Sequence, residues 1–434
     1  MPRIITALAL LLALTGTLRG QQDATIAFDL DHRSRLVYWD EGLFPSDGWV
    51  GLFSRHRSII GATWLPMPEL QIRVALANEF FRWYRHREAP DFTLDEIFVE
   101  NLFLRWQPES LPLSLTVGRQ NLMFDEGFAV MDGGPLDGSR SIYFNAVRCD
   151  VQVAPGHAVT GFALHQPPRD DVLPRVADAE RALLEVPTDG AGVHYAGDAG
   201  RSRRFSAYYL YTHEDLQDNA SVDLISGIAR HTLGARYSHG RGKEWGVTGE
   251  GNVQLGKYDV LSGFGTLQQR AWSWYAYVTW RPSALDALTA DAGMYQYSGG
   301  RFDGGDGAEG DQRYSPVFAR WPKWSESFIY TLLQLRGGIA NWSNLLAPFL
   351  RVQFRVSNPV VLRGMLQHVR ESHAAGGEGK DIGTLAILEA KLDAGRGITG
   401  HALLEHMWLR PDGVTVTVES YVWARMEVRY RLRI

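Results

Sequence analysis

Arginine is the residue type with the clearest chemical potential in this sequence. Lysine and arginine together number 44, and only five are lysine, at positions 243, 257, 323, 380 and 391. A GC-rich genome can account for the choice of arginine over lysine, but it does not account for where the arginines fall. A guanidinium is always charged and presents a planar fork to carboxylates. A column of such groups beside water would attract anions.

The arginines that interest us occupy the polar faces of alternating segments. If these segments enclose a water-filled pore, the expected lining or selectivity residues are Arg73, Arg148, Asp150, Arg351, Arg355, Arg363, Arg429 and Arg431. A second interpretation is an internal ladder of salt bridges, with Glu79, Asp150, Glu389 and Asp393 as the acids. Both can hold at once, because acidic partners would order each guanidinium and weaken its hold on a passing anion.

Catalytic motifs are missing from the sequence. It contains no GxSxG, no HExxH, no P-loop and no paired CxxC. The 13 histidines are scattered without ligand spacing, and Asp170 and Asp171 lie in a polar stretch without a partner acid. We therefore expect no catalytic residue, no metal site and no cofactor. An outer-membrane enzyme or an adhesin remains the alternative from another class.

Alternation with period two is the dominant pattern, and it recurs to the C-terminus. At the end of the chain apolar residues occupy even positions from 424 to 434, and charged residues occupy odd positions from 425 to 433. A strand separates these two sets onto opposite faces, whereas a helix would mix them. One face suits lipid and the other suits water, which is typical of the wall of a transmembrane β-barrel.

The length of the alternating segments distinguishes a barrel from a soluble sandwich. They run for ten residues or more, which a tilted membrane strand needs, and short turns alternate with long polar loops. A first count gives 19 candidate strands. Because both termini of such a barrel face the periplasm, the segment 325–335 is assigned to an external loop, which leaves about 18 strands. The predicted class is all-β, a single antiparallel transmembrane barrel.

Composition agrees with this prediction. Aromatic residues make up 12% of the 434 residues, and Trp and Tyr favour membrane interfaces. The formal net charge of −5 argues against a nucleic-acid partner, and the single cysteine, Cys149, excludes a disulfide framework. Residues 1–20 have the charged start and short apolar run of a signal peptide, so we expect residues 21–434 to form the barrel in a bacterial outer membrane.

Two motifs resemble the alginate export porin family. The first is Gly118-Arg119-Gln120 followed by the strand 144–148, FNAVR, and the second is the stretch 318–326, FARWPKWSE. The resemblance covers most of the mature chain. It implies a monomeric 18-stranded barrel with an electropositive constriction that passes a polyanionic polysaccharide, and it implies that Arg119 and Arg148 are constriction residues. Since Arg119 shares parity with the apolar Leu115 and Val117, an irregularity has to turn it inward.

Together these observations predict a passive channel that favours anions, with acidic poly- or oligosaccharide as the leading substrate class. A general or small-anion porin is the alternative. Outer-membrane lipid and periplasmic export proteins are the expected partners. In the longest connection, 299–344, we expect an ordered external lid that includes Arg320, Trp321, Lys323 and Trp324. Its apolar anchors are Trp321, Trp324, Phe328 and Tyr330.

Overall fold

The computed structural model is built entirely from antiparallel strands. It describes residues 25–42, 49–85, 96–131, 144–167, 170, 172–174, 176–177, 187–200, 202–215, 225–240, 242–260, 266–300, 312–318, 323–327, 343–373, 381–410 and 420–434. The strands are β1 (Thr25–Gly42), β2 (Trp49–Met67), β3 (Leu70–Arg85), β4 (Phe98–Trp106), β5 (Leu113–Gln120), β6 (Phe144–Ala154), β7 (His157–Gln166), β8 (Thr188–Asp198), β9 (Arg203–Asp215), β10 (Ile225–His239), β11 (Trp245–Val260), β12 (Thr266–Trp280), β13 (Leu288–Tyr297), β14 (Leu345–Arg355), β15 (Val360–Arg370), β16 (Asp381–Gly395), β17 (Ile398–Leu409) and β18 (Ser420–Arg433).

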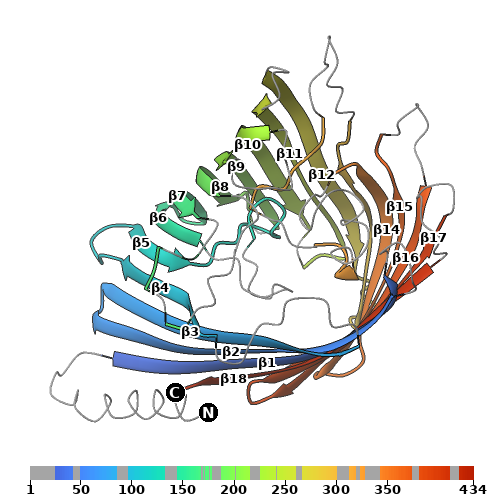
Figure 1. Cartoon of the computed structure of the whole chain (residues 1–434), viewed down its shortest axis with the longest axis horizontal. Coiled ribbons are helices and arrows are strands. Elements are labelled where there is room, and N and C mark those ends of the chain that lie inside the picture. The colour runs from blue at the N-terminus through green and yellow to red at the C-terminus, as the bar shows by residue number, and fades with distance from the viewer. Residues whose placement is uncertain are drawn as a thin grey trace.

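The sheet closes on itself. Each strand pairs with its neighbour in sequence, and β1 pairs with both β2 and β18, which completes an 18-stranded barrel (Figure 1). Closure pairs the strand edges that lipid would not tolerate. The predicted fold class and strand number are confirmed. Ser325–Ser327 lie outside the wall, as the assignment of this segment to a loop requires, and 328–335 fall outside the described residues.

Alternation along each strand sorts the side chains. In β18 Met426 and Val428 are exposed on the outer face, whereas Trp423 and Arg425 are buried toward the interior. The same division appears in β12, where Trp272 and Trp280 face outward. The outer surface is therefore apolar, as a wall facing lipid has to be, and the polar faces enclose the lumen.

The two ends of the barrel differ in their connections. Short turns join β2 to β3, β6 to β7 and β16 to β17, and the N-terminal end of β1 lies at the same end as the C-terminus. There Phe28 and Ile434 exchange backbone hydrogen bonds of 2.9 and 2.8 Å. This pattern marks the periplasmic end of an outer-membrane barrel. No helix among the described residues is long and apolar enough to cross a membrane.

Two loop segments fold into the lumen rather than away from it (Figure 1). We call residues 121–131 the first inner loop, and residues 312–318 with 323–327 the second inner loop. A parallel bridge between Val130 and Phe318 joins them. Phe128 of the first loop and Trp324 of the second belong to one buried apolar cluster with wall residues such as Tyr295. The interior is thus partly filled by the chain's own loops. The signal peptide 1–20 and the lid residues Arg320 and Trp321 lie outside the described residues.

Candidate functional site

A wall of arginines covers the lumen side where β18, β1 and β2 meet. Strand register places Arg33 opposite Arg429 on one side and opposite Arg57 on the other. Two residues further along β1, Arg35 lies opposite Arg55. Like charges directly opposite one another destabilise a sheet, so such a row needs compensation nearby.

Acidic side chains supply that compensation. Arg55 pairs with Glu79 across the β2–β3 ladder, with Nε 2.8 Å from Oε1, and both groups are buried. Two further ion pairs join Arg35 to Glu427, which is partly buried, and Arg57 to Glu100, which is buried. The salt-bridge interpretation of the sequence therefore describes much of this wall: Glu79 was among the expected acids, whereas Glu427 and Glu100 were not.

Toward the periplasmic end the pairing becomes partly open to water. Arg73 makes a bidentate contact with Asp29 at 2.6 and 2.9 Å, and Arg429 contacts Asp31 at 2.7 Å through Nε. These side chains line a cavity of about 230 Å³. Its lining comprises four arginines and three acids among ten residues: Asp29, Asp31, Arg33, Arg57, Ile59, Arg73, Glu100, Asn101, Asn121 and Arg429. We call it the arginine cavity.

Other predicted residues face the lumen away from this cavity. Arg148 pairs with Asp150 at 2.8 Å, Arg351 with Asp291 at 2.8 Å, and Arg363 with Glu389 at 3.1 Å. Two more lie near the periplasmic rim: Arg431, more than half exposed and 3.3 Å from Asp31, and Arg355, which is exposed at the end of β14. Of the predicted set, the structure brings Arg73 and Arg429 together in the arginine cavity, and it distributes the rest around the barrel.

Arg119 lies in a different environment. Gly118, with φ of +121°, supplies the irregularity that turns Arg119 away from the outer face. The position requires glycine, because a Cβ there would collide with the carbonyl oxygen of Leu102. The Arg119 side chain is 1% exposed and forks onto Asp170 at 2.8 and 2.5 Å. It also donates to the carbonyl of Val99. Arg119 thus fastens Asp170 to the wall and presents little surface to the lumen.

The first inner loop is anchored at its tip by Asp125. Its carboxylate accepts hydrogen bonds from Ser206 at 2.6 Å and His194 at 2.9 Å, and Phe124 stacks on the His194 ring at 4.4 Å. Burial raises the pKa of the Asp125 carboxyl, but these two hydrogen bonds outweigh it and hold the pKa below its usual value. Serine and histidine both contact the acid here, so this group is an anchor rather than a nucleophile with its base.

The second inner loop is attached to the opposite wall. Trp324 stacks on Tyr295 with ring centroids 4.5 Å apart, and its indole N–H donates to Tyr297 at 3.0 Å. The buried carboxylate of Glu405 accepts backbone N–H bonds from Glu326 and Ser327 at 3.0 and 3.1 Å. Of the predicted lid residues, Lys323 and Trp324 therefore lie within the lumen.

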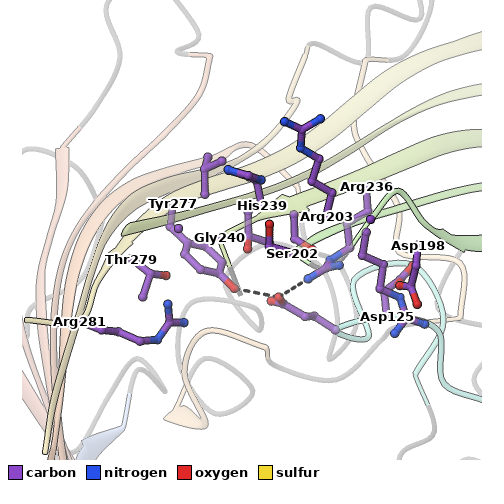
Figure 2. A pocket seen from close by; sticks show the side chains of 17 residues that line it. Asp125, Asp198, Ser202, Arg203, Arg236, His239, Gly240, Tyr277, Thr279 and Arg281 are labelled. Atoms are coloured by element: carbon purple, nitrogen blue, oxygen red, sulfur yellow. Dashed lines mark hydrogen bonds and ion pairs between the residues drawn. The ribbon is translucent and has the colours of Figure 1, made fainter. Parts of the chain in front are cut away.

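A second cavity is lined by the first inner loop and by residues at the periplasmic ends of β8 to β12, whose side chains Figure 2 shows. Its volume is about 500 Å³. Asp125 and Glu126 of the loop form part of its lining, together with wall residues that include Arg203, Arg236 and Tyr277. We call it the loop cavity.

Several of these residues were not singled out from the sequence. Arg33, Arg35, Arg55 and Arg57 occupy alternating positions in β1 and β2, and the same period-two pattern would have found them. Glu126 had no such signal, because its partners come from distant parts of the chain.

Comparison with known proteins rests on structure alone. No protein-family model and no curated protein sequence matches the chain. Solved structures do match. They include OpdK of Pseudomonas aeruginosa with vanillate (TM-score 0.61, 10% identity, 94% of this chain and 99% of that one) and OccAB4 of Acinetobacter baumannii (TM-score 0.59, 10% identity, 95% and 99%). OccK11 (OpdR) of Pseudomonas aeruginosa matches with a TM-score of 0.56 at 11% identity, over 94% of this chain and 96% of that one.

The chain therefore shares the 18-stranded fold of these outer-membrane porins. With its apolar outer band, this fold places the barrel in a bacterial outer membrane. The expected resemblance to the alginate export family gains no support from these comparisons. They agree better with the alternative that the sequence left open, a porin for small anions.

Proposed function

We propose that this protein is a passive outer-membrane channel that favours small anions, and carboxylates in particular. The arginine cavity is the observation that carries the proposal. Its lining holds four arginines and three acids. Lining charge sets the selectivity of a pore, so this excess favours anions although the whole protein is acidic.

The size of the lumen supports small permeants over acidic polysaccharide. Both inner loops occupy the interior, and the arginine and loop cavities measure about 230 and 500 Å³. Pockets of a few hundred Å³ suit small molecules. An extended polysaccharide chain would need a continuous bore, and both inner loops occupy part of the lumen.

The ligand of one structural neighbour is consistent with this proposal. OpdK was solved with vanillate, an aromatic carboxylate. Guanidinium forks such as those of Arg73 and Arg429 are suited to such a group, because two parallel N–H bonds match the two oxygens of a carboxylate. A single chain closes the barrel, so each chain forms its own pore.

Reversal potential in a planar bilayer under a potassium chloride gradient tests the proposal. The wild type should be anion selective at low salt. Replacing both Arg73 and Arg429 by Gln should move the reversal potential toward that of a non-selective pore. Arg270→Gln is the matched control, because this exposed arginine lies outward on β12. Cation selectivity of the wild type, or an equal shift in the control, would refute the assignment.

A further inference from the structure

The carboxylate of Glu126 is bound by donors from three separate elements. Arg236 of β10 donates to Oε1 at 2.8 Å, and the hydroxyl of Tyr277 on β12 donates to the same oxygen at 2.8 Å. The ammonium of Lys323, from the second inner loop, lies 3.5 Å from Oε2 and donates to the Glu126 backbone carbonyl at 2.6 Å. Figure 2 shows the first two contacts converging on one carboxylate. Two cations and a hydroxyl thus surround one acid, as in a designed anion site.

The donors are also held by features other than their contacts with Glu126. Arg236 and Tyr277 project from the inward faces of strands within the closed sheet. The Lys323 ammonium lies over two aromatic rings, 5.2 Å from the centroid of Tyr275 and 5.4 Å from that of Trp324. Cation–π contacts of this kind hold an ammonium in place without neutralising it. The donor set is therefore preorganised by the barrel wall, which carries Arg236 and Tyr277, and by the second inner loop, which carries Lys323.

The acid, in contrast, comes from a loop turn. Asp125 has φ of 50° and Gly127 has φ of +73°, so Glu126 lies between two residues in left-handed conformations. Such a turn can carry its side chain away from the site through changes at a few backbone torsions. The Glu126 carboxylate thus occupies the donor set as a ligand that is attached to the protein through the loop.

Access for a free anion is provided by the loop cavity. Arg236, Tyr277 and Glu126 all line this space of about 500 Å³, and so do Arg204 and Arg281. Within the described part of the chain, no carboxylate lies within ion-pair distance of Arg204 or Arg281. The arginines would attract a small anion into the cavity and toward the donors.

Spare hydrogen-bonding capacity remains at the site. The Nε of Arg236 and the Nδ1 of His239 are buried, and neither has a hydrogen-bond partner among the described residues. Buried polar atoms of this kind are uncommon in folded proteins, and a bound water or small molecule can supply the partner. A small molecule with a carboxylate and a further polar group could satisfy them.

We propose that Arg236, Tyr277 and Lys323 form a binding site for the carboxylate of a small anion, which Glu126 occupies when no such anion is present. The proposal rests on the function proposed above. Binding of a free carboxylate and seating of the first inner loop then exclude one another. A permeant anion that replaced Glu126 among these donors would release the tip of the first inner loop.

The exchange preserves charge balance. Removing the acid from a buried pair is costly because it leaves a cation without a counterion, whereas replacing one carboxylate by another avoids that cost. Burial raises the pKa of Glu126, but the charge of Lys323 and the hydrogen bonds from Arg236 and Tyr277 outweigh it and hold the pKa below its usual value. The site therefore selects the ionised form of a carboxyl group.

Benzoate binding to the full-length protein in detergent tests the proposal by titration calorimetry. Glu126→Gln removes the competing charge and should lower the dissociation constant about tenfold if Glu126 leaves the site free about a tenth of the time. Glu126→Asp keeps the charge but withdraws it by one methylene, so its constant should lie between those of the wild type and Glu126→Gln. Adding Arg236→Gln to Glu126→Gln should abolish the gain.

Two controls define the outcome. Glu109→Gln, on an exposed turn between β4 and β5, should bind benzoate with the affinity of the wild type. Uncharged benzyl alcohol should bind none of the variants more tightly than it binds the wild type. Equal benzoate affinity of the wild type and Glu126→Gln would overturn the proposal, as would a gain that survives the loss of Arg236. Should Glu126→Gln fail to fold, the comparison of Glu126→Asp with the wild type decides. Binding in detergent does not depend on ion selectivity, so a cation-selective wild type would refute the proposed function alone.

Discussion

At the scale of single residues, the lumen wall places arginines directly opposite one another on neighbouring strands, an arrangement that destabilises a sheet. Arg33 has an arginine opposite it on each side, Arg57 and Arg429. Like charges opposite one another cost stability. Acids such as Glu100 and Asp31 reduce that cost without removing the excess of positive charge in the arginine cavity. Departures from such local rules are most often found at functional sites, which is consistent with the pore-lining role proposed above.

Arg119 should behave as a structural residue when it is changed. Because its fork holds Asp170 in a buried pair, Arg119→Gln should destabilise the protein by about 3–5 kcal/mol. It should change ion selectivity far less than the pair of changes at Arg73 and Arg429. Urea unfolding followed by gel mobility, together with reversal potentials, separates the two effects. A large loss of selectivity with unchanged stability would instead give Arg119 the constriction role implied by the family resemblance.

The loss of stability caused by an arginine on the outer face should depend on how deep in the membrane it lies. Leu388 is 61% exposed near the middle of β16, whereas Leu432 lies two residues from the C-terminus, at the periplasmic end. Leu388→Arg should destabilise the barrel by about 2–4 kcal/mol, and Leu432→Arg by about 0–1 kcal/mol. Unfolding titrations in phospholipid vesicles measure both. Equal costs at the two positions would contradict the placement of the membrane.

At the scale of elements, the strands and the inner loops differ in how well the sequence predicts them. Alternation is a local property, so the run from Ala424 to Ile434 determines its own two faces and the period-two pattern predicts β18 directly. The inner loops depend on distant contacts. The partners of Glu126 lie 110 and 197 residues away, at Arg236 and Lys323, and no periodicity links them. The wall could therefore be predicted, whereas the two cavities could not.

The second inner loop should be released from the wall when its aromatic anchor is removed. Trp324→Ala deletes the stacking on Tyr295 and the hydrogen bond to Tyr297. The strand ladders remain, so the barrel should still fold, with an unfolding midpoint lowered by the lost packing and with an increased single-channel conductance. Trp245→Ala, at an exposed outward position, serves as the control. An unchanged conductance in Trp324→Ala would show that this loop does not restrict the pore.

Acid should release the first inner loop. The pKa of Asp125 is lowered in the seated loop, so its stabilisation is complete above the ordinary carboxyl pKa and is lost as the pH falls through the lowered value, below about pH 4. His194 of β8, Ser206 of β9 and Arg236 of β10 face this carboxyl. Glu126, which Lys323, Arg236 and Tyr277 face, titrates in the same direction.

Open-channel noise recorded between pH 7 and pH 3 measures this release. It should rise at acidic pH in the wild type. Asp125→Asn weakens the seated state at every pH, so this variant should already be noisy at pH 7 and should respond less to acid. Noise that falls on acidification would reverse the sign of the effect and contradict the anchor.

At the scale of the whole molecule, the charges act together. The protein carries a net charge of −5, yet the arginine cavity inside it has more cations than acids. Selectivity should then depend on local field rather than on total charge, and salt should weaken it, because the Debye length shrinks from about 10 Å at 0.1 M to about 3 Å at 1 M. Reversal potentials at a constant concentration ratio but rising absolute salt measure this. A preference independent of salt would contradict an electrostatic origin.

The pairing of β1 with β18 has a consequence for how the molecule is assembled. Asp31 meets Arg429 across 398 residues of chain, and Arg35 meets Glu427 across 392. Closing so long a segment is entropically costly and slow, so β1, the first strand to be synthesised, has to wait with one edge open for the last. A slip of one residue at this seam would turn every arginine of β18 toward lipid. The ion pairs across the seam therefore favour the correct register when β1 and β18 meet, so Arg429, for which we propose a role in anion selectivity, would also help to align the closing strands.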